Sequence, residues 1–418
     1  MKSFTRIPAI AGCVLVICFF VLPRADAAEK EKRPAPANYW MSVSTENQSM
    51  PGIRPEEMSE MEGLFGKMAG MPQGGAGKRL LLQLNSPRPL PSEPEALHDI
   101  PAGQKMGNAL PLEIPARPKH TREGEEEEHV YEKPKMRMLI YWGCSETVGK
   151  GQPRVLDTAH MGMAEFGKAM SGRTASRQYP PSPRAGRIYA DWPNRLNSLP
   201  VPRDSSLEGD HLVHGNYTPD IRFAVDRDHD FMAPVEFTSV KGGLDESIRF
   251  SWKKIPTSIG YFAQAMTSNE KTGEMIFWSS SELPDAGFGL LDYLPPSDVR
   301  KFIKDRVVMS PETTTCAIPK GIFTGTDGAM LQFIAYGDEL NLAHPPRPKD
   351  PKAEWNPIWT MKLRLKSTGF TPLGMESREN DSRPSRRDRE TPDSSRQREE
   401  PQQEEGGTLR KLRGIFGF

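Results

Sequence analysis

The chain has no excess of charge of either sign and comparatively few apolar residues. Lysine and arginine total 55, aspartate and glutamate total 55, and the formal net charge is zero. A general nucleic-acid binder needs a basic excess to neutralise phosphates, so this balance argues against nucleic acid as a partner. Hydrophobic residues make up 36% of the chain and 40 residues are proline, which predicts polar loops and segments beside any folded core. The length of 418 residues suffices for two domains of ordinary size.

Recognisable catalytic motifs are also missing. Neither G-x-S-x-G nor H-E-x-x-H occurs. Ser251 to Lys254 fits the S-x-x-K of serine β-lactamases and residues 271–273 fit their K-T-G, but those enzymes place the serine at a helix start and a helical domain between the motifs. Gly77-Lys78 lacks the first glycine of a phosphate-binding loop, and Arg79 replaces its serine or threonine. We therefore predict no catalytic residue, cofactor or small-molecule substrate, with an enzyme that has no recognisable motif as an alternative.

A short acidic stretch is spaced like a calcium-binding loop. Asp226, Asp228 and Asp230 alternate with other residues as in such a loop, but phenylalanines stand where the turn glycine and the bidentate glutamate belong. Three imidazoles lie nearby in sequence: His211, His214 and His229. Because the glycine and the glutamate are absent, we favour a polar turn between two strands over a metal site.

The first 27 residues have the pattern of a secretory signal peptide. Lys2 and Arg6 precede a short apolar run over residues 7–23, and Ala25-Asp26-Ala27 fits a cleavage site. A membrane anchor needs about 20 apolar residues, more than this run contains. We expect the mature chain to begin at Ala28 and to be periplasmic or secreted.

A Met-rich segment over residues 28–77 follows, and we expect it to be flexible. Apolar residues from position 58 to 68 fall on one helical face, which glycines weaken. Thioethers are soft ligands that suit Cu(I), and the candidate ligands are Met58, Met61, Met68 and Met71. We favour an adaptable apolar face for protein contact, since no histidine or cysteine joins the cluster, and keep periplasmic copper handling as an alternative.

A nine-residue stretch occurs twice, at 138–146 and 274–282. Both copies are compact apolar and aromatic runs that end in Ser-Glu, and both read as short buried strands. The repeat predicts two β-sandwich-like units, over residues 78–232 and 233–370, with Trp142 and Trp278 buried in separate sheets. In the first unit we expect strands at 78–84, 137–144, 210–213 and 221–225, a helix at 159–170, and an extended surface chain at 171–206.

The second unit has the clearer strand pattern, and the predicted fold class is mainly β. Seven short strands are expected at 235–240, 248–252, 261–266, 274–278, 314–318, 330–336 and 359–365, as in a β-sandwich. The stretch from Ile248 through Trp252 to Phe262 resembles the second and third strands of a fibronectin type III domain. A predicted helix at 296–305 departs from that family.

The mature chain also resembles a family of exported proteobacterial proteins without assigned activity. The matching stretches are residues 141–144, 278–282, 289–295 and 341–348. This resemblance implies export from the cytoplasm and no particular activity.

Two cysteines remain after cleavage, Cys144 and Cys316. In an oxidising compartment they are able to form a bridge if the two units pack side by side. We favour two buried free thiols. No histidine lies near either cysteine in sequence, so a thiol nucleophile has little support.

Residues 376–407 alternate charges among polar residues, and we predict a disordered tail over residues 371–418. Its tip is apolar and basic, and a helix there has one apolar face, formed by Leu409, Leu412, Ile415 and Phe416. Such a tip suits an anionic membrane surface or the groove of an envelope protein. The sequence therefore favours an exported, non-enzymatic binding or assembly protein of the bacterial envelope, with the tip as a tethered docking element.

Overall fold

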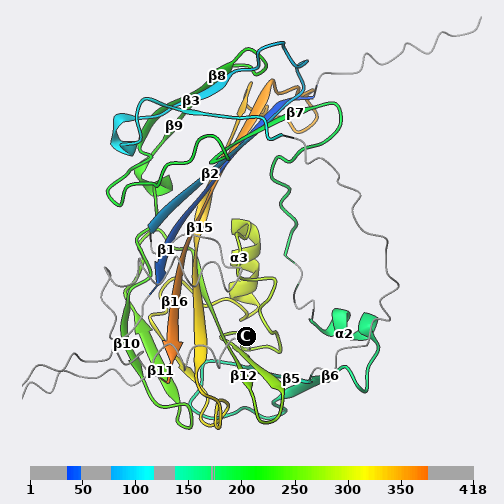
Figure 1. Cartoon of the computed structure of the whole chain (residues 1–418), viewed down its shortest axis with the longest axis vertical. Coiled ribbons are helices and arrows are strands. Elements are labelled where there is room, and N and C mark those ends of the chain that lie inside the picture. Colours follow the sequence, from blue (N-terminus) through cyan, green and yellow to red (C-terminus); the bar gives the residue numbers. More distant parts are fainter. Residues whose placement is uncertain (1–34, 49–76, 117–136, 171–172, 174, 375–418) are drawn as a thin grey trace, which may run out of the picture. The chain divides into compact units, whose positions relative to one another are not determined.

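The computed structural model describes residues 35–48, 77–116, 137–170, 173 and 175–374 (Figure 1). As the sequence predicts, this part of the chain is mainly β, and its strands form three sheets. The helices of the described residues are α2 (Met163–Met170) and α3 (Pro296–Lys304), with two single 3₁₀ turns, η1 (Ala102–Gln104) and η2 (Arg227–His229).

The largest sheet has nine strands (Figure 1). In spatial order they are β6 (Arg154–Asp157), β5 (Arg137–Trp142), β13 (Glu274–Ser279), β12 (Gly260–Asn269), β15 (Ala329–His344), β16 (Trp359–Leu373), β1 (Ala37–Gln48), β2 (Gly77–Ser86) and β7 (Ile188–Trp192). The pairs β1–β16 and β13–β5 are parallel. The other neighbours are antiparallel.

Two smaller sheets accompany it. One contains β10 (Phe237–Lys241), β11 (Ile248–Trp252) and β14 (Thr315–Ile318). The other contains β4 (Ala109–Pro111), β3 (Ala96–Asp99), β8 (Gly209–Gly215) and β9 (Ile221–Val225). Both are antiparallel throughout.

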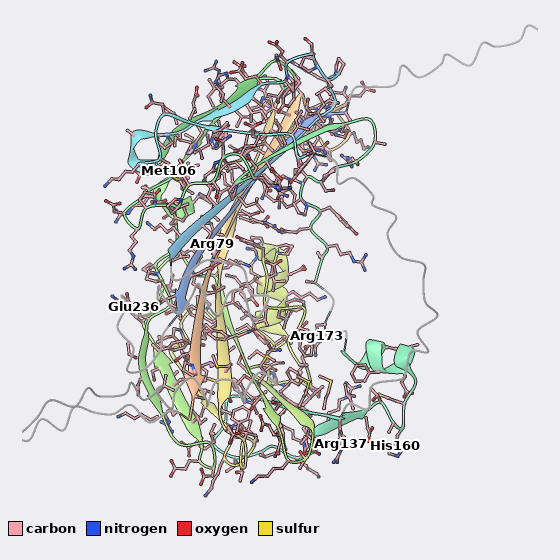
Figure 2. The ribbon with its side chains drawn as sticks, in the orientation of Figure 1. Arg79, Met106, Arg137, His160, Arg173 and Glu236 are labelled. Atoms are coloured by element: carbon pink, nitrogen blue, oxygen red, sulfur yellow. A yellow bond between two sulfur atoms is a disulfide. The ribbon has the colours of Figure 1, made fainter. Side chains whose placement is uncertain are left out.

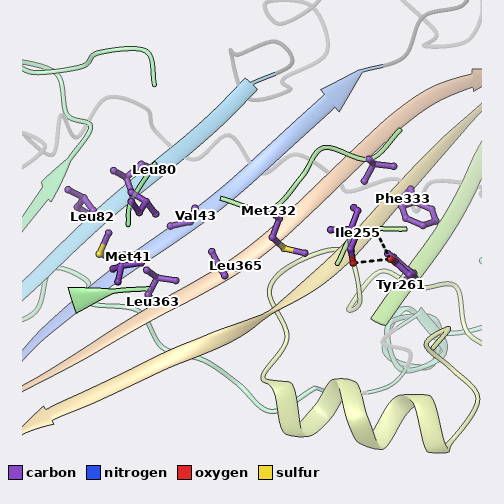
Figure 3. Packing of buried hydrophobic residues seen from close by; sticks show 14 of the residues in the cluster. Met41, Val43, Leu80, Leu82, Met232, Ile255, Tyr261, Phe333, Leu363 and Leu365 are labelled. Carbon is purple, nitrogen blue, oxygen red and sulfur yellow. Dashed lines mark hydrogen bonds between the residues drawn. The ribbon is translucent and has the colours of Figure 1, made fainter. Parts of the chain in front are cut away.

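The main hydrophobic core lies between the nine-stranded sheet and the two smaller sheets, in a sandwich-like layering. Alternate residues of β1, β2, β15 and β16 are buried here, among them Met41, Leu82, Phe333 and Leu363 (Figure 3). The rings of Trp252 and Phe333 are in tilted contact across the layers, with their centroids 4.7 Å apart. We call this side of the large sheet the packed face. Burying so much apolar and aromatic surface supplies the main favourable free energy of the fold.

The opposite side of the large sheet is covered over only part of its width. Helix α3 and its flanking loops pack on β12 and β15 through Val299, Phe302, Ile334 and Tyr336. A smaller cluster around Ile140 and Phe277 covers β5, β6 and β13. Residues 260–265 of β12 and 329–337 of β15 are therefore buried on both sides, and they are mostly apolar rather than alternating, whereas residues 338–344 of β15 are exposed or partly exposed.

The predicted elements of the second unit are confirmed. All seven expected strands are present as β10 to β16, and the helix expected at 296–305 is α3, which begins with Pro296 in its first turn. Strands expected at 78–84, 210–213 and 221–225 are also present, with slightly longer bounds for the first two. The fibronectin resemblance stays a prediction.

The prediction that the repeated strands lie in separate sheets is wrong. They are β5 and β13, which pair with each other in parallel in the nine-stranded sheet, with Trp278 opposite Tyr141. An ion pair joins Arg137 (labelled in Figure 2) to Glu274 at the start of the two strands. Trp278 is fully buried, as expected, whereas Trp142 is only partly buried. Sequence similarity identified both strands but not their pairing.

The Met-rich segment is shorter than expected, because residues 37–48 form β1 in the middle of the large sheet. Tyr39, Met41 and Val43 alternate along this strand and are buried in the main core. β1 connects β16 to β2, so residues from both predicted units share one sheet and one core.

Candidate functional site

On the side of the large sheet opposite the packed face, strands β16, β1 and β2 carry polar and aromatic side chains. Strand β16 reads Lys362-Leu-Arg364-Leu-Lys366, and its alternation buries the leucines while the three cations point to the other side. The register places Trp40 beside Lys362 and Ser42 beside Arg364. We call this surface the polar face; its residues are Trp40, Ser42, Gln83, Asn85, Lys362, Arg364 and Lys366.

Arg364 is the central residue of the polar face. Its guanidinium lies 5.3 Å from the ring centroid of Trp40 and 4.2 Å from that of Tyr293, a residue of the loop before α3. Its Nε donates to Ser42 Oγ at 2.9 Å. Burial lowers the pKa of Arg364, but an arginine stays protonated at neutral pH. A permanent cation is thus held between two aromatic rings.

Two lysines flank this arginine. The Lys362 ammonium lies 5.3 Å from the Trp40 ring and pairs with Glu339, whose carboxylate is almost fully buried. The Lys366 ammonium lies 4.3 Å from the Tyr293 ring and 2.7 Å from Asp292. Burial raises the pKa of Tyr293, so its phenol stays neutral at physiological pH. Cations, carboxylates and rings therefore alternate across the polar face.

An extended segment crosses the polar face. It begins at Arg173 (labelled in Figure 2) and runs through residues 175–187 to the start of β7. The Arg173 N–H donates to Asp285 at 2.9 Å, and the Ser176 hydroxyl donates to Asp298 of α3 at 3.0 Å. We call residues 175–187 the strap. An extended surface chain was expected at 171–206. Residues 175–184 have no regular secondary structure, but residues 188–192 form β7, whose Ile188, Ala190 and Trp192 are buried, so the expectation is wrong there.

The middle of the strap is tied to the strands through one amide. The Gln178 side chain accepts from Arg364 at 3.2 Å and donates to Glu339. Farther along, Gln83 and Asn85 of β2 donate to the strap carbonyls of Pro181 and Ser182 at 3.0 and 3.1 Å. Pro181 is buried, while residues 182–186 are exposed. The strap is thus held mostly by side chains.

A second polar cluster lies in the packed core and connects two sheets. Tyr39 Oη lies 2.9 Å from His98 Nδ1, and His98 Nε2 lies 2.9 Å from His211 Nδ1. His211 Nε2 lies 2.8 Å from the Leu207 carbonyl oxygen. A carbonyl only accepts, so His211 donates there, His98 donates to His211, and Tyr39 donates to His98. All three side chains are buried, and the ring of Phe223 stacks on His211.

This chain of hydrogen bonds needs both imidazoles neutral. Burial lowers the pKa of His98 strongly, and the neighbouring His211 adds to the effect. Burial likewise lowers the pKa of His211, against the opposing hydrogen bond to Leu207. With no exposed atom at its centre, the cluster is a structural connection between β1, β3 and β8.

The acidic stretch at 226–230 is a polar turn, as favoured. Asp226 caps the turn η2 by accepting from the backbone N–H groups of Asp228 and His229. Asp230 accepts from Ser206 and Leu207 instead of facing the other carboxylates. Of the nearby imidazoles, His211 belongs to the buried chain above, His214 pairs with Asp99 and His229 pairs with Asp226. No group of three potential ligands that could hold a metal occurs among the described residues.

The cysteine prediction is wrong. Cys144 and Cys316 form a disulfide with Cα atoms 5.0 Å apart. The cysteines meet because the end of β5 and strand β14 lie side by side, since β14 belongs to the sheet that covers the packed face. The bridge joins these two layers.

One of the remaining predicted sites lies within the described residues, and the others lie outside them. Ser251 lies on strand β11 and Lys254 pairs with Glu312, so the β-lactamase-like spacing is a coincidence, as interpreted. The candidate copper ligands Met58, Met61, Met68 and Met71 lie outside the described residues. The same is true of the signal peptide and of the tip residues Leu409, Leu412, Ile415 and Phe416.

Sequence reasoning missed the polar face. The alternation of leucine with lysine and arginine at 362–366 was a readable sign of a strand with one cationic side. Trp40 and Tyr293 had no such sign, because only the pairing of β1 with β16 and the loop before α3 bring them to Arg364.

Comparison with models of known protein families gives no match, and comparison with curated proteins gives none either. In the described part of the chain, no helix is long and apolar enough to cross a membrane. Any assignment of function therefore rests on the geometry described above.

Proposed function

We propose that the protein is an exported, non-enzymatic binding or assembly protein of the bacterial envelope, and that the polar face, on which the strap lies, is its binding surface. The observation that carries this proposal is the grouping of Trp40, Tyr293 and Arg364 on a partly covered sheet surface. Tryptophan, tyrosine and arginine dominate the binding free energy of protein interfaces, because they combine a large contact area with specific polar contacts.

The disulfide supports export. Structural disulfides form and persist in oxidising compartments such as the periplasm and are rare in the cytosol. Cys144–Cys316 ties two layers of the fold together, which is a structural use of the bridge. The sequence pattern of residues 1–27 agrees with this location.

Photocrosslinking in cells tests the binding surface. Benzoylphenylalanine at Tyr179, a strap residue with 73% exposure, should give a discrete crosslinked product in the envelope fraction. The same group at Val148, an exposed residue of the loop after β5, is the positional control. Arg364→Ala should reduce the product, whereas Arg249→Ala, on an exposed arginine of β11, should not. Equal products at both positions, or a product insensitive to Arg364→Ala, would contradict the proposal.

We also propose that the tip formed by Leu409, Leu412, Ile415 and Phe416 tethers the protein to a membrane surface or an envelope protein. Four apolar side chains provide only a few kcal/mol before ordering costs, so binding should be weak and, on anionic lipid, sensitive to salt. Deleting residues 409–418 should lower recovery with the envelope at low salt and leave the thermal unfolding transition unchanged. Equal recovery of both forms at low and high salt would remove the tip from the proposal.

A further inference from the structure

The strap is bound as an extended polypeptide, not as a strand of the sheet. Its residues 175–187 have no ladder pairing, and β2 reaches its backbone through the side-chain amides of Gln83 and Asn85. These amides contact the carbonyls of two consecutive residues, Pro181 and Ser182. Every polypeptide offers such carbonyls, so these contacts recognise an extended chain with little regard to its sequence.

One side chain of the strap is recognised more specifically. The Gln178 amide uses its oxygen to accept from Arg364 and its nitrogen to donate to Glu339. Arg364 supplies only donors and the Glu339 carboxylate only acceptors. A primary amide carries one acceptor and one donor group on the same carbon, so it matches Arg364 and Glu339 together.

The prolines of the strap favour this mode of binding. Residues 179–183 read Tyr-Pro-Pro-Ser-Pro, and proline fixes its own backbone while holding the preceding residue extended. A pre-extended segment loses little conformational entropy when it binds, which is why proline-rich segments dock on aromatic surfaces. Pro181 is the buried residue of this stretch, and the residues after it are exposed.

Most of the strap is exposed and Pro181 is its one buried residue, although Arg187 at its end also donates to Asn85 and to the Pro36 carbonyl. Each neutral hydrogen bond contributes about 0.5–1.5 kcal/mol, and one to a charged group about 1.5–3 kcal/mol. Segments with few buried contacts and side-chain ties open at low free energy without unfolding the core. The strap is therefore displaceable, although its attachment to α2 and β7 gives it an effective concentration in the millimolar range.

We propose that the polar face binds an extended, proline-containing polypeptide segment of a partner, and that the strap occupies this site as an intramolecular competitor. The proposal rests on the proposed function in taking the polar face as the binding surface. The partner segment presents a primary amide to Arg364 and Glu339 and two successive backbone carbonyls, three and four residues later, to Gln83 and Asn85.

The test uses a fluorescent peptide of residues 175–187 and the mature chain with residues 175–185 replaced by a Gly/Ser linker of equal length. In fluorescence anisotropy, the linker chain should bind the peptide, and the wild-type chain should bind it at least about tenfold more weakly, because the strap competes. A peptide carrying Gln178→Ala and Pro181→Ala should bind the linker chain more weakly than the wild-type peptide. An intact disulfide and a cooperative unfolding transition establish that the linker chain is folded.

Three outcomes would overturn the proposal. The folded linker chain fails to bind the peptide, or both chains bind it equally, or the wild-type chain exchanges straps between copies and forms a dimer that grows with concentration in sedimentation. Should the linker chain not fold, the full chain with Gln178→Ala and Pro181→Ala replaces it, with the same expected gain in peptide affinity and the same overturning results. Peptide binding in vitro without crosslinking in cells would refute the envelope role alone. Crosslinking in cells without peptide binding in vitro would refute the choice of ligand alone.

Discussion

The two faces of the nine-stranded sheet differ sharply although the same strands build both. On β16 (Figure 1), Leu363 and Leu365 are buried in the main core (Figure 3), and the alternation places Lys362, Arg364 and Lys366 on the polar face. The packed face makes its contacts with two complete sheets, and the polar face makes its contacts with a single strap and a loop. We infer that alternation lets one strand stabilise the fold with one side and serve recognition with the other.

The largest difference should appear when neighbouring residues of β16 are truncated. Leu365→Ala removes a fully buried side chain and should cost about 2–5 kcal/mol of unfolding free energy, through lost burial and a residual cavity. Lys366→Ala removes a mostly buried cation whose partner, Asp292, is exposed, and an ion pair with a solvent-exposed partner contributes about 0–1 kcal/mol. Urea denaturation of both variants measures the contrast. Similar losses for the two would mean that the polar face contributes to stability as the packed face does.

Removing the disulfide should have the next largest effect on the unfolding free energy, because the bond links one covering sheet to the packed face. The bond joins residues 172 positions apart. Replacing both cysteines by serine should lower the unfolding free energy by about 2–4 kcal/mol, since the unfolded chain regains the freedom that the bridge removes. A reductant should destabilise the wild-type protein and have no further effect on the serine variant. A variant as stable as the oxidised wild type would leave the bridge without a role in holding the layers together.

Local sequence patterns predicted the strands well, and pairing was the point at which they failed. Strand β11 at Ile248–Trp252 was predicted with its correct bounds because its apolar residues alternate and turns flank it. No local sequence pattern indicates that residues 274–279 pair in parallel with residues 137–142, since parallel strands are joined by a long crossover. Strand β1 was hidden for a different reason: Met41 was read as part of a methionine cluster, although Tyr39, Met41 and Val43 form a period-2 pattern.

The candidate site depended on these missed pairings. Arg364 could be recognised in the sequence as a cation in an alternating strand. Its two aromatic partners are distant in sequence: Trp40 lies 324 residues before it and Tyr293 lies 71 residues before it. The prediction of free thiols failed for the same reason. The Cα atoms of Cys144 and Cys316 lie 5.0 Å apart because of the layering of the sheets, which no local pattern indicates.

The smallest predicted effect concerns the polar chain inside the packed face. Burial lowers the pKa of His98 and of His211 from the ordinary value of 6.5, so the unfolded chain binds protons at pH values where the folded protein does not. Unfolding free energy should therefore be fully retained above about pH 6.5 and fall as the pH drops below it, by up to about 1.4 kcal/mol per pH unit for each histidine. Urea denaturation at pH 7.5, 6.5 and 5.5 measures this slope.

Two histidine variants isolate the contribution of the buried chain from that of other titrating groups. His98→Gln keeps a polar side chain but removes one titrating group, so its stability should depend less on pH between 6.5 and 5.5 than that of the wild type, whatever its absolute stability. His160→Gln is the matched control for the substitution itself, because the His160 side chain is 84% exposed and lies outside the buried chain. A slope that His98→Gln does not reduce would show that the packed face tolerates a proton on this chain. The contrast between the two faces would then lie in packing alone and not in the exclusion of charge.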